Sequence, residues 1–414
     1  MRSFEVVGLE MHSRSMWYHA HVRKVLNFMG NNGFNALIFH QSDILNHLVY
    51  PSKYLDSQMM WEKFCALRSF EIENNRLYLK NIIEEAAKKE IDVYFNLKEI
   101  FYTDEIVELY PELIRQKGTV CPTDPFWWEY IEACIDDLCT TVPGFKGVIL
   151  SNGTHESRTS ITKRNCCECE RCKNVNPFDW YYEGFNAVNI PLKKHGKKFI
   201  VRDFSFTAGN QDIILEACTK VDKDIIISLK NTPHDYYPTF PDNPKIGTTG
   251  QEEWVEFDTW GQFYGGGIFP ASVAEDMKER LNYCHNKGVK GVFFRTDWEG
   301  MYENSTFSSP NMINLYAAGL LANNVDADLD HAYKKWGDAG WNEILKCDSD
   351  NANPIPAANP NAWKNMRDFI KASWEVVRKT VYVRGHWFCE DNMFPDSIDK
   401  AFKMMVYVHG RDEW

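Results

Sequence analysis

The segment Asp124–Ser151, DPFWWEYIEACIDDLCTTVPGFKGVILS, decides the fold of this chain. Its first part repeats apolar residues at three- and four-residue spacing, the period of a helix with one buried face, and Asp124 is a candidate N-cap. Its last part, Gly147–Ser151, is a short apolar run, as expected for a strand that is buried on both faces. The segment therefore predicts a helix that leads directly into a buried strand.

The alternation of helix and strand continues on both sides of this segment. Further apolar, strand-like runs are Glu5–Glu10, Asn35–His40, Asp92–Leu97, Lys198–Phe204, Asp224–Lys230, Trp254–Asp258 and Gly291–Arg295. Helical patterns separate them, and the one that closes at Gly33 has the glycine that helices favour at their C-terminal end. Eight β-then-α units predict an α/β fold, the (β/α)8 TIM barrel.

The pattern becomes helical after about residue 325 of the 414-residue chain. Helices are expected within 329–345, 361–382 and 397–408, and a polar loop with prolines, 347–360, separates the first two. We therefore predict a catalytic barrel in residues 1–325 and a helical C-terminal region in 326–414. That region should either pack on the barrel or mediate homodimer formation.

Charge and hydropathy exclude several classes of function. The net charge is −12, so the surface should repel nucleic acid and anionic membranes, and neither is expected as a partner. No apolar run reaches the length of a transmembrane helix. The first residues lead straight into a strand, so we expect no signal peptide in this chain and a cytoplasmic protein, unless a signal has been removed. The scattered cysteines favour a reducing compartment.

Three carboxylates follow three different predicted strands. Glu156 comes after GVILS, Asp235 after DIIISLK, and Asp258 ends WVEFD. In a parallel barrel the C-terminal ends of the strands carry the chemistry, so these acids should meet in one mouth. Acids in one cleft can divide into a proton donor and a base, which is what glycoside hydrolysis needs. We predict these three as the catalytic residues.

Two cations at strand ends bear on the class of substrate. Arg202 and Lys230 lie in or at the end of apolar strands, where an unpaired charge is costly. They either pair with nearby acids such as Asp203 or Asp258, or bind an anionic ligand such as a sugar carboxylate. A uronic acid is then the expected substrate. The remaining candidate substrate-binding residues, also at strand ends, are His40, Lys98, Asn152, His155, Trp260 and Trp298.

A cysteine-rich segment follows the fourth predicted strand. Cys166, Cys167, Cys169 and Cys172 lie within NCCECERC. The CxCxxC spacing suits either zinc or a local disulfide. So short a stretch would be sterically cramped around one ion, and no second CxxC follows. We therefore expect no catalytic metal, with a structural staple of this loop as the alternative.

Five segments resemble, in order, the α-glucuronidases of glycoside hydrolase family 67. They are TDPFWWEYIEACIDDLCTTVPGFKGVILSNGTHE, GKKFIVRDFSF, IIISLKNTPHDYYP, VEFDTWGQFYGGG and NMINLYAAGLLANNVDADLDHAYKKWG. The resemblance implies that Glu156 is the catalytic acid, that Arg202 holds the glucuronate carboxylate, and that Lys230 and Asp235 belong to the site. Asp258 stands where that family has a glutamate. The chain starts at the first barrel strand, without the family's N-terminal β-domain.

The resulting hypothesis is an inverting α-glucuronidase-like hydrolase that acts on an acidic oligosaccharide and needs no cofactor. Glu156 would protonate the glycosidic oxygen, and Asp235 and Asp258 would activate and orient a water, with carboxyl groups roughly 6.5–9.5 Å apart. Three alternatives stay open. One is a retaining or substrate-assisted hexosaminidase-type barrel with His155 and Glu156 as its acid pair. The others are a carbohydrate-binding barrel without catalysis and a metal-dependent aldolase or isomerase barrel.

Overall fold

The structure is a computed structural model. It describes residues 2–55, 66–115, 118–152, 157–162, 167–203, 208–233, 235–237, 240–263, 265–298, 305–339, 361–380 and 396–403. Its strands form a closed barrel in the order β1-β2-β3-β4-β5-β6-β7-β8. The neighbouring strands β1 and β8, β2 and β3, β3 and β4, β4 and β5, and β5 and β6 pair in parallel. The predicted (β/α)8 TIM barrel is confirmed.

The strands lie close to where the sequence places them. They are β1 (Val6–Met11), β2 (Ala36–His40), β3 (Asp92–Lys98), β4 (Gly147–Ser151), β5 (Lys198–Arg202), β6 (Ile226–Lys230), β7 (Glu253–Asp258) and β8 (Gly291–Arg295). Every residue of β2, β4, β6 and β8 is buried. Burial on both faces explains why these strands are nearly continuous apolar runs and do not alternate with polar residues.

Helices follow the strands in the predicted alternation. They are α1 (His19–Asn31), α3 (Ala66–Ala87), α4 (Asp104–Leu109), α5 (Phe126–Thr141), α6 (Glu170–Lys173), α7 (Pro177–Lys194), α8 (Ala208–Val221), α9 (Ala274–Asn286), α10 (Met312–Asn323), α11 (Asp330–Ala339), α13 (Ala362–Thr380) and α14 (Ile398–Lys403). Helix α1 ends at Asn31, and Gly33 adopts the positive φ of 78° expected of a terminating glycine.

Helix α5 shows how the sequence builds one of these elements. Its buried residues include Trp127, Ile131, Ile135 and Leu138, which recur every three or four positions along one face. The start differs slightly from the prediction, because Pro125 and not Asp124 occupies the N-cap position. Asp124 still accepts a hydrogen bond from the backbone N–H of Phe126 at 3.2 Å, so its carboxylate satisfies one of the helix's unpaired donors.

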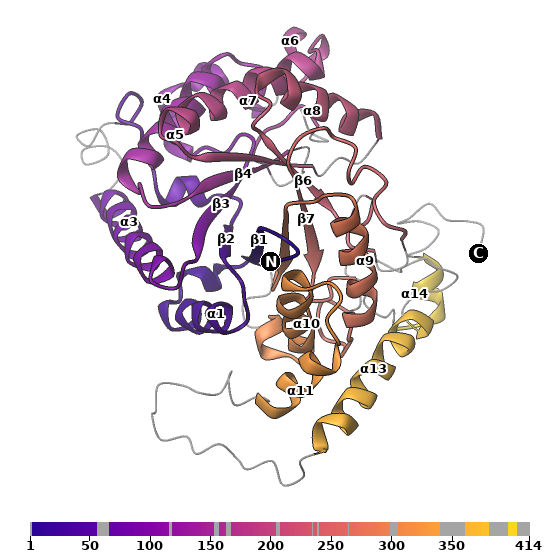
Figure 1. Cartoon of the computed structure of the whole chain (residues 1–414). Helices are drawn as coiled ribbons and strands as arrows, with labels where there is room; N and C mark the ends of the chain where they lie inside the picture. Colours follow the sequence, from indigo (N-terminus) through magenta and orange to yellow (C-terminus); the bar gives the residue numbers. More distant parts are fainter. Residues whose placement is uncertain are drawn as a thin grey trace. The chain divides into compact units, whose positions relative to one another are not determined.

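The contacts divide the chain into two compact units. Unit 1 comprises Met1–Phe34, Lys230–Pro244 and Val255–Trp414, and unit 2 comprises Asn35–Leu229 and Lys245–Trp254. Within unit 2, α5 packs on α7 and α7 packs on α8 (Figure 1). The predicted boundary near residue 325 falls inside unit 1, and it stays a prediction.

Within unit 1, the C-terminal helices pack against one another and against α9. Helix α11 contacts both α10 and α13 (Figure 1). Arg367 of α13 donates two hydrogen bonds to Asp330 of α11, at 2.9 and 2.8 Å, and Lys371 pairs with Glu275 of α9 at 2.8 Å. This supports packing on the barrel helices, and the homodimer stays a prediction.

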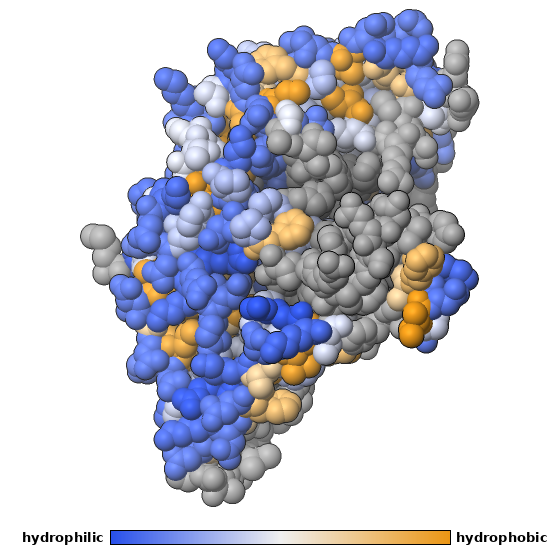
Figure 2. Space-filling view, turned by 90° about the vertical axis from the view of Figure 1, so that its right-hand side faces the viewer, coloured by the Kyte–Doolittle hydropathy of each residue, from blue (hydrophilic) through white to orange (hydrophobic). Residues whose placement is uncertain are grey.

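Most of the coloured residues on the face drawn in Figure 2 are hydrophilic, with hydrophobic residues between them. This agrees with the excess of 58 acidic over 46 basic residues. Among the residues that the structure describes, no helix combines the length and the apolar character needed to span a bilayer.

Candidate functional site

A group of six charged residues with buried side chains lies at or just after the C-terminal ends of strands in unit 1. We call them the charged cluster: Glu10, Lys230, Asp235, Glu256, Asp258 and Arg295. Lys230 ends β6, Asp258 ends β7 and Arg295 ends β8. Glu10 of β1 stands directly beside Arg295 in the β1–β8 pairing. Glu256 lies two residues before Asp258, so the two side chains leave the same face of β7.

Lys230 is enclosed by acids and one aromatic ring. Its ammonium Nζ lies 2.5 Å from Asp235 Oδ1 and 3.9 Å from Glu256 Oε1. The side chains of the three residues are between 0% and 8% exposed. Nζ also lies 4.1 Å from the ring centroid of Tyr236. The geometry supports the pairing alternative for Lys230, with Asp235 and Glu256 as its partners.

Arg295 is the second cation of the charged cluster. Its Nε lies 4.0 Å from Asp258 Oδ1, and its Nη2 donates a hydrogen bond to Gln262 Oε1. The guanidinium carbon lies 4.8 Å from the ring centroid of Tyr236. The ring of Tyr236 therefore contacts both buried cations, and its quadrupole favours positive charge at its face.

The environments of the two candidate catalytic aspartates move their pKa values apart. Burial raises the pKa of Asp235, but the charges of Lys230 and Arg295 and the hydrogen bond from Lys230 outweigh it, and the pKa ends below its ordinary value. Burial also raises the pKa of Asp258, and there Arg295 and three backbone N–H groups offset only part of the effect. One carboxyl group is thus kept ionised while the other holds a proton more readily, a division that acid–base catalysis uses.

Asp258 also organises the loop that follows β7. Its Oδ1 accepts a hydrogen bond from Trp260 N at 3.0 Å, and its Oδ2 accepts from Gly261 N at 3.0 Å and Gln262 N at 2.8 Å. Three such bonds fix the backbone that carries Gln262, the acceptor for Arg295. Asp258 therefore has a structural task beside any role in chemistry.

The glycines of this loop allow close packing on Trp260. Gly267 has a φ of 72°, and a Cβ atom built on it would lie 2.4 Å from Trp260 Nε1. The indole is fully buried, with a relative exposure of 0%, and Nε1 has no hydrogen-bond partner among the described residues. Trp298, the other predicted stacking residue, is partly exposed. Stacking of either residue on a sugar stays a prediction.

Replacement of Gly267 by alanine should strongly destabilise the protein. The positive φ costs an L-residue about 1–2 kcal/mol, and overpacking against a rigid indole adds about 1–3 kcal/mol. Gly250→Ala is the matched control, because its φ is 76° and no described atom lies within 4 Å of the added Cβ. Urea unfolding should rank Gly267→Ala well below Gly250→Ala, and equal losses would contradict the packing argument.

The lowered pKa of Asp235 predicts a dependence of stability on pH. Because the folded-state pKa lies below the ordinary 3.8, the ionised carboxylate stabilises the fold above pH 3.8. This contribution is lost as the pH falls from there through the folded-state pKa. Asp235→Asn should therefore lose less stability than the wild type on acidification from about pH 5 to pH 3. Urea unfolding at several pH values measures this, and parallel curves would contradict it.

Unit 2 brings together four of the other predicted site residues. Lys98 Nζ lies 3.2 Å from His40 Nε2. Arg202 donates to Ser151 Oγ at 3.3 Å, and Asn152 Nδ2 donates to the carbonyl oxygen of Arg202 at 3.4 Å. Lys98, Ser151 and Arg202 are direct neighbours in register across β3, β4 and β5. They form one polar row at the C-terminal ends of these strands.

Two predicted residues, His155 and Glu156, lie outside the described residues, as does Cys166. The predicted carboxyl separation and the role of Glu156 therefore stay predictions. Within unit 1 the structure brings together Lys230, Asp235 and Asp258, because the two aspartates share Arg295 as a charge neighbour.

Arg295, Tyr236 and Glu256 were not among the predicted site residues. The end of the last strand already places Arg295 beside the other strand-end groups, and two-residue periodicity places Glu256 on the face of Asp258. No comparable sequence signal identifies Tyr236, because its contact with two cations depends on how the loop after β6 folds back.

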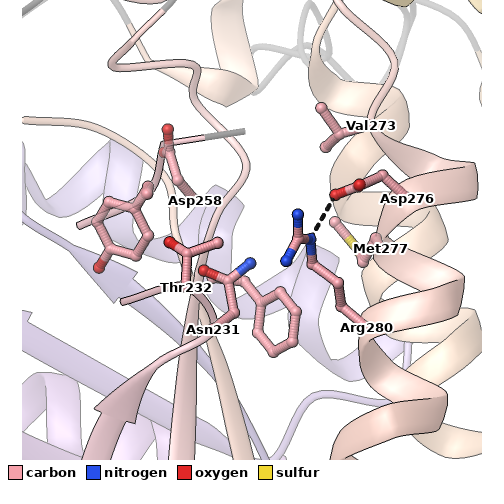
Figure 3. Close-up of a pocket in the computed structure, with 9 residues that line it drawn as sticks. Asn231, Thr232, Asp258, Val273, Asp276, Met277 and Arg280 are labelled. Atoms are coloured by element: carbon pink, nitrogen blue, oxygen red, sulfur yellow. Dashed lines mark hydrogen bonds and ion pairs between the residues drawn. The ribbon is translucent and has the colours of Figure 1, made fainter. Parts of the chain in front are cut away.

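A small pocket in unit 1 is lined in part by Asp258. Asn231, Thr232 and Asp258 lie on one side of it, and Arg280 faces them from α9, hydrogen-bonded to Asp276 at 2.8 Å (Figure 3). Its volume is about 30 Å³, enough for about one water molecule. Ligand pockets measure about 300–1,000 Å³, so this pocket is not the sugar site, although a water there would lie beside Asp258.

Solved structures with a similar fold are glycoside hydrolases. A glycoside hydrolase family 138 enzyme targeting the pectin rhamnogalacturonan II has a TM-score of 0.65 and 13% identity, over 92% of this chain and 44% of that one. The β-N-acetylhexosaminidase of Bacteroides fragilis has a TM-score of 0.52 and 11% identity, over 81% of this chain and 70% of its own. The N-acetyl-β-hexosaminidase of Streptomyces plicatus has a TM-score of 0.51 and 10% identity, over 83% of this chain and 69% of its own.

Sequence comparison adds no closer relative, since no family model and no curated protein matches the chain. The chain spans less than half of the pectin-targeting enzyme. Likeness at such low identity concerns the fold, and the resemblance to family 67 stays a prediction. The fold of this chain is the TIM-type barrel found in these glycoside hydrolases.

Proposed function

We propose that this chain is a glycoside hydrolase and that the charged cluster forms part of its active site. The observation that carries the proposal is the burial of six ionisable groups at the C-terminal ends of β1, β6, β7 and β8. Core packing does not require these charged groups, because apolar residues of similar volume would fill the same space without the free-energy cost of desolvating charges. In this fold, that end of the barrel carries the chemistry.

The two aspartates support a division of labour. Asp235, with its lowered pKa, is the ionised group that orients a water or a substrate amide. Asp258 accepts hydrogen bonds from three backbone N–H groups and lies beside Arg295. Ionisation of its carboxyl group therefore changes the electrostatic potential at the end of β7. Glu156 remains the proposed proton donor to the glycosidic oxygen.

The finer choice concerns the sugar. The comparisons support the hexosaminidase alternative better than an α-glucuronidase, because two N-acetylhexosaminidases share the fold and none of the structures compared above is an α-glucuronidase. The pairing of Lys230 with Asp235 points the same way, since a cation already matched by a buried acid is a poor receptor for a sugar carboxylate. In a substrate-assisted reaction the acetamido oxygen attacks the sugar carbon, and an ionised carboxylate such as Asp235 holds the amide N–H.

An acidic sugar remains the second candidate, because specific observations favour it. The structure with the TM-score of 0.65 belongs to an enzyme that targets a rhamnogalacturonan, and a galacturonan is an anionic polymer. Arg202 and Lys98 add two buried cations at the ends of β5 and β3. If a uronate is the substrate, Arg202→Met should raise KM for the uronate far more than for a neutral sugar.

A panel of substrates tests the proposal. The purified chain is assayed with nitrophenyl N-acetyl-β-hexosaminides, nitrophenyl uronides and rhamnogalacturonan oligosaccharides. We expect release of one sugar class, with loss of activity in Asp235→Asn. Proton NMR of the first product then separates inversion, expected of an α-glucuronidase-like enzyme, from retention, expected of substrate assistance. Binding of an oligosaccharide without cleavage would show the non-catalytic alternative instead, and full dependence on a divalent ion would favour the aldolase or isomerase alternative.

A further inference from the structure

Four cysteine sulfurs of unit 2 meet at one point. The Sγ atoms of Cys121, Cys167, Cys169 and Cys172 all lie within 4.8 Å of one another. Cys121 Sγ is 3.6 Å from both Cys169 Sγ and Cys172 Sγ. All four are free thiols. We propose that these residues, the four-cysteine cluster, bind one structural zinc ion as four thiolates.

The spacing of the sulfurs fits a tetrahedral ion better than disulfides. With a Zn–S bond of about 2.3 Å, the sulfurs of a tetrahedral site are roughly 3.8 Å apart, close to the 3.6 Å found here. A disulfide places two sulfurs about 2.05 Å apart, and its formation does not require a second pair of sulfurs nearby. Four protein ligands fill the coordination shell, so the site is structural and leaves no open position for chemistry.

The ligands come from two connections of the chain. Cys167, Cys169 and Cys172 belong to the connection after β4 and to the short helix α6. Cys121 belongs to the connection after β3, just ahead of α5. The CxCxxC spacing therefore supplies three ligands, and the fourth is distant in sequence. This removes the objection that a single short stretch would be cramped around one ion.

The surroundings hold both connections in place. Trp127 Nε1 donates to the carbonyl oxygen of Cys121 at 2.7 Å, and Trp180 Nε1 donates to that of Pro122 at 2.9 Å. Indole groups from α5 and α7 thus fix the backbone around the first ligand. Orientation of metal ligands by such outer hydrogen bonds is usual in zinc sites.

Charge and hydrogen bonding near the sulfurs also suit bound thiolates. Thr123 Oγ1 lies 3.3 Å from Cys121 Sγ and from Cys172 Sγ, so its hydroxyl can donate to a sulfur. Arg171, beside Cys172, pairs with Asp124 at 2.7 Å and links the same two connections. Binding of Zn²⁺ by four thiols releases four protons and leaves a complex of charge −2, which an adjacent guanidinium partly balances.

A zinc ion here would fasten the connection after β4 to the one after β3. The connection after β4 contains Glu156 in its sequence, but the proposal does not depend on the role of that residue. It predicts an effect on folding that is independent of catalysis, so metal content and activity can be tested separately.

Metal analysis of the intact chain tests the proposal. Protein expressed with added zinc and purified without chelator should contain about one zinc per chain. Cobalt in place of zinc should give the visible bands of a tetrahedral site and the near-ultraviolet charge-transfer absorption of thiolate ligands. Cys121→Ala and Cys169→Ala should lose both signals, whereas Cys139→Ala, which removes a buried thiol of α5 outside the four-cysteine cluster, should keep them.

If the cysteine variants fail to fold, measurements on the wild-type protein still test whether the four cysteines bind zinc. A mercurial reagent that blocks thiols should release the zinc, and a chelator should lower the Tm of the wild type. Protein without bound metal whose cysteines all react as thiols in denaturant would overturn the proposal. So would an intact mass lowered by two hydrogens for each disulfide, because the sulfurs would then be oxidised.

Discussion

Asp235→Asn should lower the free energy of unfolding by about 3–5 kcal/mol, because it leaves the buried ammonium of Lys230 without its closest counter-charge. The two groups are 2.5 Å apart, and their side chains are 2% and 8% exposed. Glu256, at 3.9 Å from Lys230, compensates only in part. The same variant should reduce kcat by about 10²–10⁴, the range for removal of a positioned acid–base group.

A double variant separates the two effects. Lys230→Met in the Asp235→Asn background removes the unmatched cation, so it should recover part of the lost stability without restoring turnover. Urea unfolding and kcat are measured on both single variants and on the double variant. If stability and activity return together, Asp235 acts only through the fold, and its place in the proposed mechanism is wrong.

An exposed ion pair of the same types is the control. Lys245 and Asp212 are 2.6 Å apart, with side chains 32% and 64% exposed. Asp212→Asn breaks a pair that water already solvates, so the loss should be about 1 kcal/mol or less, with unchanged activity. A loss as large as that of Asp235→Asn would show that burial is not what makes the Lys230 pair costly to break.

Glu156→Gln should reduce kcat by about 10²–10⁴ on natural oligosaccharides, whose leaving groups need a proton. Nitrophenyl glycosides release nitrophenolate, a stabilised anion that needs no proton to leave. The variant should therefore retain far more activity on these substrates. The variant should also lose the decline of activity at high pH, because that decline reports ionisation of the general acid. Initial rates on both kinds of substrate, measured across pH, check the prediction.

Glu132→Gln is a suitable control, because Glu132 is exposed on α5. It should leave both rates unchanged. If Glu156→Gln lowers the rates on nitrophenyl and natural substrates equally, the residue does not protonate the leaving group. Full activity on both would remove Glu156 from the mechanism.

The sequence located the strands and the polar groups at their ends to within one or two residues. Both signals are local, since an apolar run of five residues such as GVILS needs no distant partner to be recognised. The same applies to Gly33, because the end of a helix depends on the φ of one residue. The sequence left two partners open for Lys230, because a cation at a strand end can bind an anionic ligand or pair with an acid of the protein equally well.

The sequence by itself determined a (β/α)8 barrel with acids and cations after its strands, because periodicity and strand-end position are properties of neighbouring residues. Only the tertiary structure decided which charges neutralise one another. Lys230 of β6 pairs with Glu256 of β7 at 3.9 Å, and Cys121 meets Cys172 from 51 positions away. Such contacts form where the chain returns to the same place after a whole β/α unit or more, and the energy that selects them depends on burial, which no local pattern records.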